Sequence, residues 1–372
     1  MSDLSYAETE TDFVPPVAMP PALQTVAPMP AFDPTAPLVE RTVSLGGFFQ
    51  PKMSAFTVSA RLRGRDVLTD TDLTPDEIGE VLDTAMRLKR LHRKGESHAY
   101  LPGKTLGLIF QHPSTRTRVS LEVGMAQLGG QAMFLGMNDL QLSRGETIAD
   151  TGAILSRYVD IVAARVAKHS DLVELAEGAS VPVLNGLSDK SHPMQALSDL
   201  LTLQERVGAL AGLKLAYVGD GSNNMIASLL LAGAAMGIHV SVASPKGYTP
   251  DPEVINHATW LAGKSGVGSG AKISITDDAA ATVKDADAVY TDVHVSLGQA
   301  DGSTRAVALA PYKVTPEMMT HAKPSAIFMH CLPMHRGEEV DAAVADGPQS
   351  VIFDQAENRL HLQKALILQA LC

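Results

Sequence analysis

The chain has 372 residues, 45% of them hydrophobic, and a formal net charge of −11 at pH 7. This length provides for two domains of ordinary size, while the negative charge and the lack of a basic run of five residues argue against a general nucleic-acid-binding surface. No apolar run approaches the ~20 residues of a membrane-spanning helix, so we expect a soluble protein that does not bind membranes.

Cysteine and histidine usage narrows the chemistry further. Cys331 and Cys372 have no CxxC spacing and cannot form a disulfide framework, which predicts a reducing compartment, the cytoplasm. The 12 histidines show no spacing typical of metal ligands, since His335 follows His330 by five residues in a predicted loop. We therefore expect neither a metal ion nor a cofactor.

The N-terminal region differs in composition from the rest. Residues 1–52 hold 9 of the 22 prolines and six acidic against two basic residues, without apolar periodicity. We predict a disordered, Pro-rich tail over residues 1–60. It lacks the features of a secretory signal and the Arg-rich, acid-poor composition of a transit peptide. Met53 is an alternative start, which the intact mass of the native protein would test.

Strands and helices alternate from there on. Thr74-Pro-Asp-Glu77 predicts the start of a helix by its cap, its first-turn proline and its acids. The runs typical of buried parallel strands are Thr105–Phe110, Ala132–Leu135, Ile161–Arg165, Val181–Leu184, Lys214–Val218, His239–Ala243, Lys272–Ile275, Ala288–Thr291 and Ala326–His330. They predict an α/β fold with two doubly wound parallel sheets, in domains 61–206 and 207–355, joined by a helix over His192–Arg206.

Polar motifs follow several of these strands. Because ligands of open parallel sheets bind beyond the carboxyl ends of the strands, the motifs predict one cleft between the two domains. Ser114-Thr-Arg-Thr-Arg118 lies between a strand and a helix start, where free N–H groups, hydroxyls and guanidiniums together suit a phosphate. The alternative is a helix cap followed by surface arginines.

Three further residues stand out near the predicted cleft. Arg165 closes a buried strand, where an arginine is unusual, although a structural ion pair would also explain it. His192 begins a helix and Gln195 lies one turn later, so both can face one point. A histidine at a helix start is otherwise commonly a cap.

The chain resembles the aspartate/ornithine carbamoyltransferase family. Ser114–Arg118 is similar to the phosphate-binding signature of that family, and His330-Cys-Leu-Pro333 is similar to the second signature of its ornithine branch. Four further motifs resemble the family in the same order: His192–Gln195, Gly219–Met225, Asp292–Gly298 and Glu357–Arg359. The resemblance runs from about Gly64 to the C-terminus.

The resemblance implies transfer of a carbamoyl group from carbamoyl phosphate to L-ornithine, giving L-citrulline and phosphate. It assigns carbamoyl phosphate to Ser114, Thr115, Arg116, Thr117, Gln141, Arg165, His192, Gln195, Cys331, Leu332 and Arg359. Of these, Arg116, Arg165, His192 and Cys331 carry catalysis. It assigns ornithine to Asn224, Asp292, Ser296 and Leu297. Arg118 is left out because alternate helix positions cannot all face one ligand, and Asn223 is read as turn chemistry.

The resemblance also implies how the chain assembles. The last helix, over residues 356–372, would return to the first domain and supply Arg359. Gln141 would come from a neighbouring subunit, which implies an oligomer, a homotrimer by the family default.

The substrate motif departs from the family at two positions. His294 stands where the ornithine branch has Trp, and Leu297 stands where it has Met. We expect His294 to remove a large apolar wall of the amine pocket, which keeps open a sister enzyme acting on putrescine or a modified ornithine. An aspartate enzyme is disfavoured because Asp292 would repel a second carboxylate. A nucleotide-dependent oxidoreductase is disfavoured because Gly219-Asp-Gly-Ser-Asn-Asn is not GxGxxG.

Overall fold

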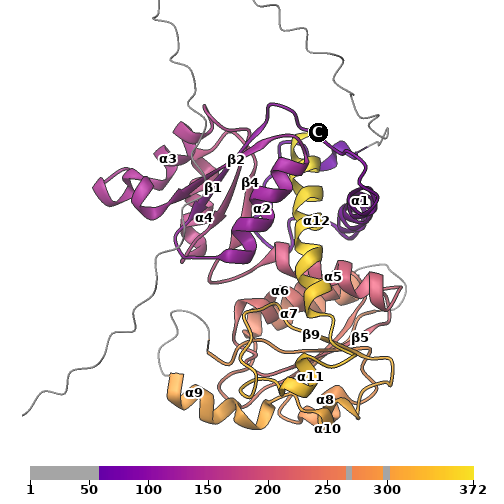
Figure 1. The fold of residues 1–372 in the computed structure, drawn as a ribbon. Coiled ribbons are helices and arrows are strands. Elements are labelled where there is room, and N and C mark those ends of the chain that lie inside the picture. The colour runs from indigo at the N-terminus through magenta and orange to yellow at the C-terminus, as the bar shows by residue number, and fades with distance from the viewer. Residues whose placement is uncertain (1–57, 265–269, 296–301) are drawn as a thin grey trace, which may run out of the picture. The chain divides into compact units, whose positions relative to one another are not determined.

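Two parallel β-sheets organise the chain in the computed structural model, which describes residues 58–264, 270–295 and 302–372 (Figure 1). Every ladder between named strands of these residues is parallel, which confirms the predicted fold class. The first sheet has the order β2 (Gln131–Gly136), β1 (Thr105–Phe110), β3 (Ile161–Arg165), β4 (Val183–Leu187). The second has the order β7 (Ile273–Thr276), β6 (His239–Ala243), β5 (Lys214–Val218), β8 (Ala288–Tyr290), β9 (Ile327–Met329).

Strand β4 differs most from its predicted position. It begins two residues later than predicted and continues through Asn185 and Gly186, which read as turn residues in the sequence. The Asn185 side chain donates to the carbonyl of Leu68 at 2.8 Å, and this bond compensates the burial of a polar amide within a strand. The strand therefore reaches Leu187, which pairs with Arg165 after a register shift.

Helices cover both faces of the first sheet (Figure 1). One face packs against α3 (Ile148–Leu155) and α4 (His169–Gly178), through an apolar cluster that includes Val162 and Leu172. The other face packs against α1 (Pro75–Arg93), α2 (Thr115–Gln127) and α12 (Ile352–Leu371). Helix α1 starts at the predicted cap Thr74, which forms a capping box with Glu77.

The second sheet is covered in the same way. Helices α5 (Pro193–Arg206), α6 (Asn224–Ala235) and α7 (Pro252–Lys264) lie towards one face, and α8 (Ala279–Val283), α10 (Pro316–Met319) and α11 (Ala342–Ala345) lie towards the other (Figure 1). Helix α9 (Gly302–Leu309) follows β8. Short 3₁₀ turns are Ala60–Leu62, Met137–Asp139, Gln141–Arg144 and Ala310–Tyr312.

Helix α12 begins four residues before its predicted start. Its first turns contact β9, and its length then packs along α1, α2 and α5, which confirms the expected return to the first sheet. One apolar cluster runs without interruption from Leu106 of the first sheet through Leu201 of α5 to Tyr217 of the second. Among the helices of the described residues, none is both long and apolar enough to span a membrane.

Candidate active site

A cavity of about 560 Å³ lies where the strands of both sheets end. Segments following β1, β3, β4, β5, β8 and β9 all contribute to it, together with α12. The described residues that line it are Ser114, Arg116, Thr117, Arg165, Leu187, His192, Gln195, Asn224, Met225, Asp292, Val293, Val295, Cys331, Leu332, Pro333, His335 and Arg359. Eleven of the residues predicted for the site are therefore brought together.

The start of α2 forms one end of the cavity. Ser114 is the N-cap residue, yet its side chain makes no capping hydrogen bond, which leaves the hydroxyl to a ligand. The first N–H groups of a helix have no partner within the helix, so they point at the same space as the hydroxyl. Thr115 is exposed and its side chain does not line the cavity. Only its backbone N–H can serve the predicted role.

Three guanidinium groups converge beside this helix start. Among the described residues, no ion pair includes Arg116, Arg165 or Arg359, and the Nε atom of each is buried without a hydrogen-bond partner. Burial and the like charge of Arg116 lower the pKa of Arg359 to about 10 and also lower the pKa of Arg165. Three positive charges without an acid partner, that of Arg359 buried and the other two half-buried, favour an anion in the cavity.

Arg118, two residues after Arg116, does not face the cavity. It is exposed, pairs with Glu122 at 3.0 Å one turn along α2 and lies over the ring of Phe134 at 3.6 Å. It contributes nothing to the cavity lining.

His192 and Gln195 lie at the start of α5. The His192 side chain does not cap the helix, and its Nδ1 atom is buried with no hydrogen-bond partner among the residues that the structure describes. Burial, reinforced by Arg359, Arg165 and Arg116, holds the pKa of His192 well below its usual value, so the imidazole is neutral at pH 7. A neutral imidazole donates one hydrogen bond without adding a fourth positive charge.

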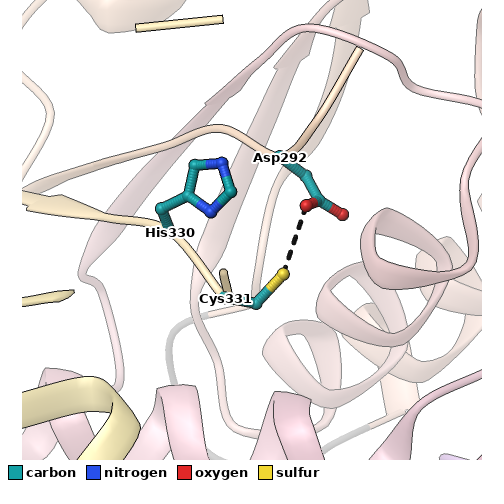
Figure 2. Close-up of side chains that lie close together, drawn as sticks. All are labelled: Asp292, His330 and Cys331. Carbon is teal, nitrogen blue, oxygen red and sulfur yellow. Dashed lines mark hydrogen bonds between the residues drawn. The ribbon is translucent and has the colours of Figure 1, made fainter. Parts of the chain in front are cut away.

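The far side of the cavity carries an acid and a thiol (Figure 2). The Cys331 Sγ atom donates to Asp292 Oδ1 at 3.2 Å, and the Val293 N–H donates to the same oxygen at 2.8 Å. Burial, followed by the Asp292 charge, raises the pKa of Cys331 well above its usual value. The thiol is therefore protonated and acts as a donor, and a thiolate nucleophile is disfavoured.

Two asparagines at the start of α6 have separate roles. Asn224 lines the cavity while its Nδ2 atom donates to the carbonyl of Ser188 at 2.7 Å. Asn223 caps α6 by accepting from the Ile226 N–H at 2.9 Å, as turn chemistry predicts. It also donates to Asp292 Oδ2 at 3.4 Å and to the Tyr217 hydroxyl at 2.9 Å, so it holds the acid in place. The sequence did not reveal this second role, because Asp292 follows 69 residues later.

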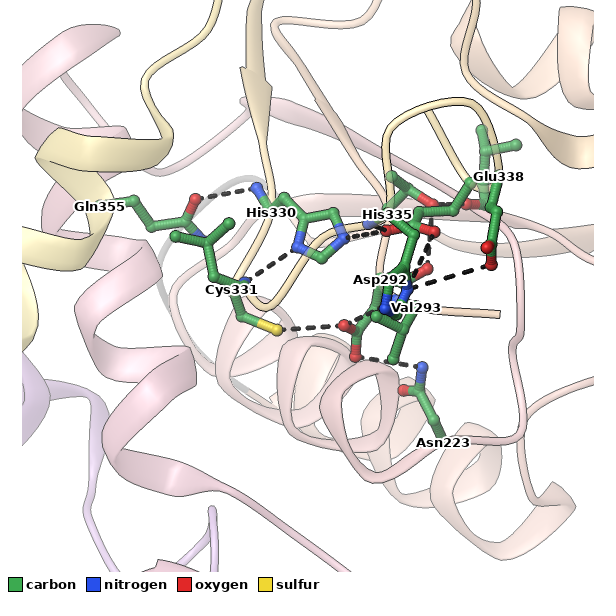
Figure 3. Close-up of polar contacts among 12 residues, drawn as sticks. Asn223, Asp292, Val293, His330, Cys331, His335, Glu338 and Gln355 are labelled. Atoms are coloured by element: carbon green, nitrogen blue, oxygen red, sulfur yellow. Dashed lines mark hydrogen bonds and ion pairs between the residues drawn. The ribbon is translucent and has the colours of Figure 1, made fainter. Parts of the chain in front are cut away.

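The turn after β9 follows His330 and Cys331, which lie beside Asp292 in Figure 3, and it aims a backbone carbonyl into the site. Leu332 has a φ of +62°, which is rare for a residue with a Cβ, and precedes a cis peptide bond to Pro333. Its N–H donates to His330 Nδ1 at 2.9 Å, and its carbonyl accepts from Arg116 Nη2 at 2.6 Å. The His330 proton then lies on Nε2, which faces Glu339 Oε1 at 3.2 Å.

The remaining predicted residues lie elsewhere. Gln141 is exposed in a 3₁₀ turn and does not line the cavity of its own chain. Ser296 and Leu297 lie outside the described residues. His294 is buried beside Gly219 and is not among the described residues that line the cavity, so the effect of its replacing Trp on the amine pocket stays a prediction. Val293 and Val295, on either side of His294, line the cavity.

Asp292, His330 and Cys331 offer ligand atoms within 4.8 Å of one another, a spacing that a metal ion would accept. Both ring nitrogens of His330 already have partners, and the Cys331 thiol resists deprotonation, whereas a metal needs a free imidazole nitrogen and a thiolate. Hydrogen bonds therefore account for this cluster. His335, Glu338 and Glu339 form a second group at the cavity mouth, where Glu339 already accepts from His330 and the His335 N–H.

Comparisons with known proteins agree with this geometry. Residues 65–205 match the family model described as "Aspartate/ornithine carbamoyltransferase, carbamoyl-P binding domain", and residues 211–370 match its "Asp/Orn binding domain". The chain is 53% identical over 307 residues to an ornithine carbamoyltransferase of Pyrococcus abyssi, which covers 82% of this chain and 95% of that protein. An anabolic ornithine carbamoyltransferase of Pyrococcus furiosus is 52% identical over 82% of this chain and 96% of its own length.

The fold is also similar to that of a solved structure. The ornithine carbamoyltransferase structure from Pyrococcus furiosus superposes with a TM-score of 0.80 at 51% identity, covering 83% of this chain and 98% of that one.

Proposed function

Because the chain belongs to the aspartate/ornithine carbamoyltransferase family, we propose that it transfers the carbamoyl group of carbamoyl phosphate to L-ornithine, releasing L-citrulline and phosphate in arginine biosynthesis. The observation that carries the proposal is the meeting of three unpaired guanidiniums with a buried acid and thiol in one cavity. The first group suits a phosphate and the second suits an amine.

The phosphate of carbamoyl phosphate binds at the start of α2. Its oxygens accept hydrogen bonds from the N–H groups of the first turn, the Ser114 hydroxyl, and the guanidinium groups of Arg116 and Arg359. Thr117 accepts from Arg359 Nη2 and so holds that guanidinium group towards the helix. Arginines already paired with carboxylates would have to lose those pairs before binding, and these three have none to lose among the described residues.

The carbamoyl carbonyl oxygen gains negative charge as the amine attacks. Arg165 and the neutral His192 lie on the cavity wall beside it and donate hydrogen bonds to that oxygen in the tetrahedral intermediate. Gln195 and the Leu332 carbonyl face the carbamoyl amine. The carbon–nitrogen bond to ornithine forms, the bond to the phosphate oxygen breaks, and the departing phosphate is a base close enough to take the amine proton.

Ornithine must present a neutral δ-amine. Its ordinary pKa lies near that of lysine, ~10.4, so deprotonation at pH 7 costs about 4.6 kcal/mol. A buried pocket offsets part of this cost because desolvation disfavours the charged amine. Asp292 orients the amine together with the Cys331 thiol, and Asn224, Ser296 and the Leu297 backbone bind the amino-acid head group. Asp292 is therefore a binding residue, since a carboxylate also favours the protonated amine.

We assign carbamoyl phosphate to residues 61–206 with 356–372, and ornithine to residues 207–355. We further propose a cytoplasmic homotrimer in which Gln141 completes the cavity of a neighbouring subunit. Exposure of Gln141 away from its own cavity supports this. So does an apolar patch on α2 and β2, where Val119, Val123 and Met133 are 50%, 40% and 49% exposed.

The decisive experiment compares ornithine, putrescine, lysine and aspartate as acceptors with the purified protein and carbamoyl phosphate. We expect the kcat/KM for ornithine to exceed that for each of the other three acceptors by at least tenfold. A preference for putrescine or a modified ornithine would move the activity to a sister enzyme with the same phosphate site.

A further inference from the structure

A buried carboxylate behind the cavity receives hydrogen bonds from three elements. Asp199 lies on α5 one turn after Gln195, is fully buried and does not line the cavity. Its Oδ1 atom accepts from Gln195 Nε2 at 2.9 Å and from Gln355 Nε2 at 2.7 Å. Its Oδ2 atom accepts from the Tyr290 hydroxyl at 3.0 Å. Asp199 thus joins α5, α12 and β8.

These bonds fix which end of the Gln195 amide faces the cavity. A carboxylate oxygen and an amide oxygen are both acceptors and cannot bond to each other, so the nitrogen of Gln195 must point to Asp199. The oxygen Oε1 is the end left for the cavity, which Gln195 lines. Without Asp199 the amide would be free to present either end.

Gln355 is fixed independently and strengthens this assignment. Its Oε1 atom accepts from the His330 N–H at 2.9 Å (Figure 3). Its Nε2 atom must therefore be the end that reaches Asp199. The same carboxylate is therefore tied to the backbone just before Cys331. Asp199 therefore fixes both the orientation of Gln195 and, through Gln355, the backbone at the start of the turn.

We propose that Asp199 is a positioning residue that presents the Gln195 carbonyl oxygen to the carbamoyl –NH₂ group. An acceptor at this point distinguishes a carbamoyl group, which has N–H donors, from an acetyl group of the same size, which has none. The proposal rests on the proposed function and deepens it, because it names the groups that set selectivity for carbamoyl over acyl phosphates.

Protonation of Asp199 does not change this arrangement. Burial raises the pKa of Asp199 to about 7, so both states are populated near neutrality. A proton on Oδ2 would be donated to the Tyr290 oxygen, since a hydroxyl can accept as well as donate. The two amide bonds to Oδ1 remain in either state.

The test measures the KM for carbamoyl phosphate and the competitive Ki for acetyl phosphate, and their ratio gives the selectivity. In Asp199→Leu, which has a similar shape and no acceptor, we expect the selectivity to fall by about 5- to 10-fold, the value of one net hydrogen bond. The Ki for inorganic phosphate should stay within about twofold, because the guanidiniums are unchanged. Asp199→Asn should keep the wild-type selectivity, because its amide oxygen replaces Oδ1 and its –NH₂ donates to the Tyr290 oxygen.

Two further variants keep the test decisive if Asp199→Leu does not fold. Asp199→Ser leaves space for a water molecule, which accepts and donates equally and so does not orient Gln195. It should lose selectivity as Asp199→Leu does. Thr202→Val is the matched control, because it removes a buried polar contact two turns from Gln195 on the same helix, and its selectivity should be that of the wild type.

Wild-type selectivity in both Asp199→Leu and Asp199→Ser would overturn the proposal, and so would an equal loss in Thr202→Val. Failure of the wild-type protein to form citrulline would instead refute the proposed function, so the two failures are distinguishable.

Discussion

Arg359 in the last helix and Thr117 in α2 meet across 242 residues of sequence, where Arg359 Nη2 donates to Thr117 Oγ1 at 2.5 Å. The proposed phosphate end of the cavity is therefore built from segments far apart in the chain. Helix α12 lines the candidate active site as well as packing in the core.

Arg359→Gln should weaken carbamoyl phosphate binding by about 10-fold or more, because a hydrogen bond to a charged group is lost from a buried site. Arg93→Gln is the control: Arg93 pairs with Glu357 on the surface at 3.1 Å, and its loss should change binding by less than about twofold. Equal effects of both substitutions on the KM for carbamoyl phosphate would remove Arg359 from the site.

Arg116→Ala should weaken carbamoyl phosphate binding by ~2 kcal/mol or more, since it removes a charge-assisted pair. Arg118→Ala, two residues along α2, should leave binding within about twofold because its partners are Glu122 and Phe134. Isothermal titration with inorganic phosphate would measure both. A larger effect at Arg118 would contradict the placement of the phosphate.

His192→Ala should lower kcat by about 10²-fold, the usual effect of losing a donor to a developing oxyanion, while the KM for ornithine stays nearly unchanged. Since the pKa of His192 lies well below its usual value, the wild-type kcat should show no titration of this imidazole between about pH 6 and 8. Steady-state kinetics across that range would test both. An unchanged kcat in the variant would exclude His192 from catalysis.

Asp292→Asn should raise the KM for ornithine by about 10-fold or more, with the KM for carbamoyl phosphate little affected. The carboxylate faces the amine side of the cavity and is held by Cys331 and Asn223, so the substitution preserves shape but removes charge. Unaltered ornithine kinetics in this variant would mean that the assigned substrate is wrong.

His361 should make the fold sensitive to acid. Burial and the nearby charges of Lys364 and Lys89 lower its pKa to about 2, so the folded protein keeps this side chain neutral. Below pH ~6.5 this histidine binds a proton in the unfolded chain but not in the folded chain. The free energy of unfolding therefore falls by about 1.4 kcal/mol for each pH unit of acidification.

Urea unfolding of the wild type and of His361→Gln at pH 7.5 and 5.5 would measure this effect. The loss of stability between the two pH values should be about 1.4 kcal/mol smaller in the variant. Equal losses would assign the acid sensitivity to other groups.

Most of the fold was predictable because buried parallel strands are short apolar runs, and the limits of β1, β3, β5 and β6 agree with prediction to the residue. The bounds of β4 were predicted wrongly because this strand contains Asn185. The burial of Asn185 depends on the Leu68 carbonyl, which is distant in the sequence and which no local pattern reveals. The first turn of α12 was missed for a similar reason, because Gln355 is buried there by contacts with Asp199 and His330.

The site was predictable wherever a side chain follows a strand end. Arg165 and Cys331 are of this kind. Asp199 was not, because its role depends on three donors from segments up to 156 residues away, and a lone acid within a helix has no distinctive sequence pattern. The placement of His294 was not predictable, because its position in the motif does not say which way the side chain turns.

The apolar cluster that continues from the first sheet through α5 into the second has a thermodynamic consequence. If the part of the chain around one sheet unfolded, the apolar residues of this cluster around the other sheet would also be exposed to water. The free energy of unfolding either part therefore includes the cost of exposing the shared cluster. Calorimetry should therefore record a single heat-absorption peak for residues 58–372, and neither half expressed alone should melt cooperatively.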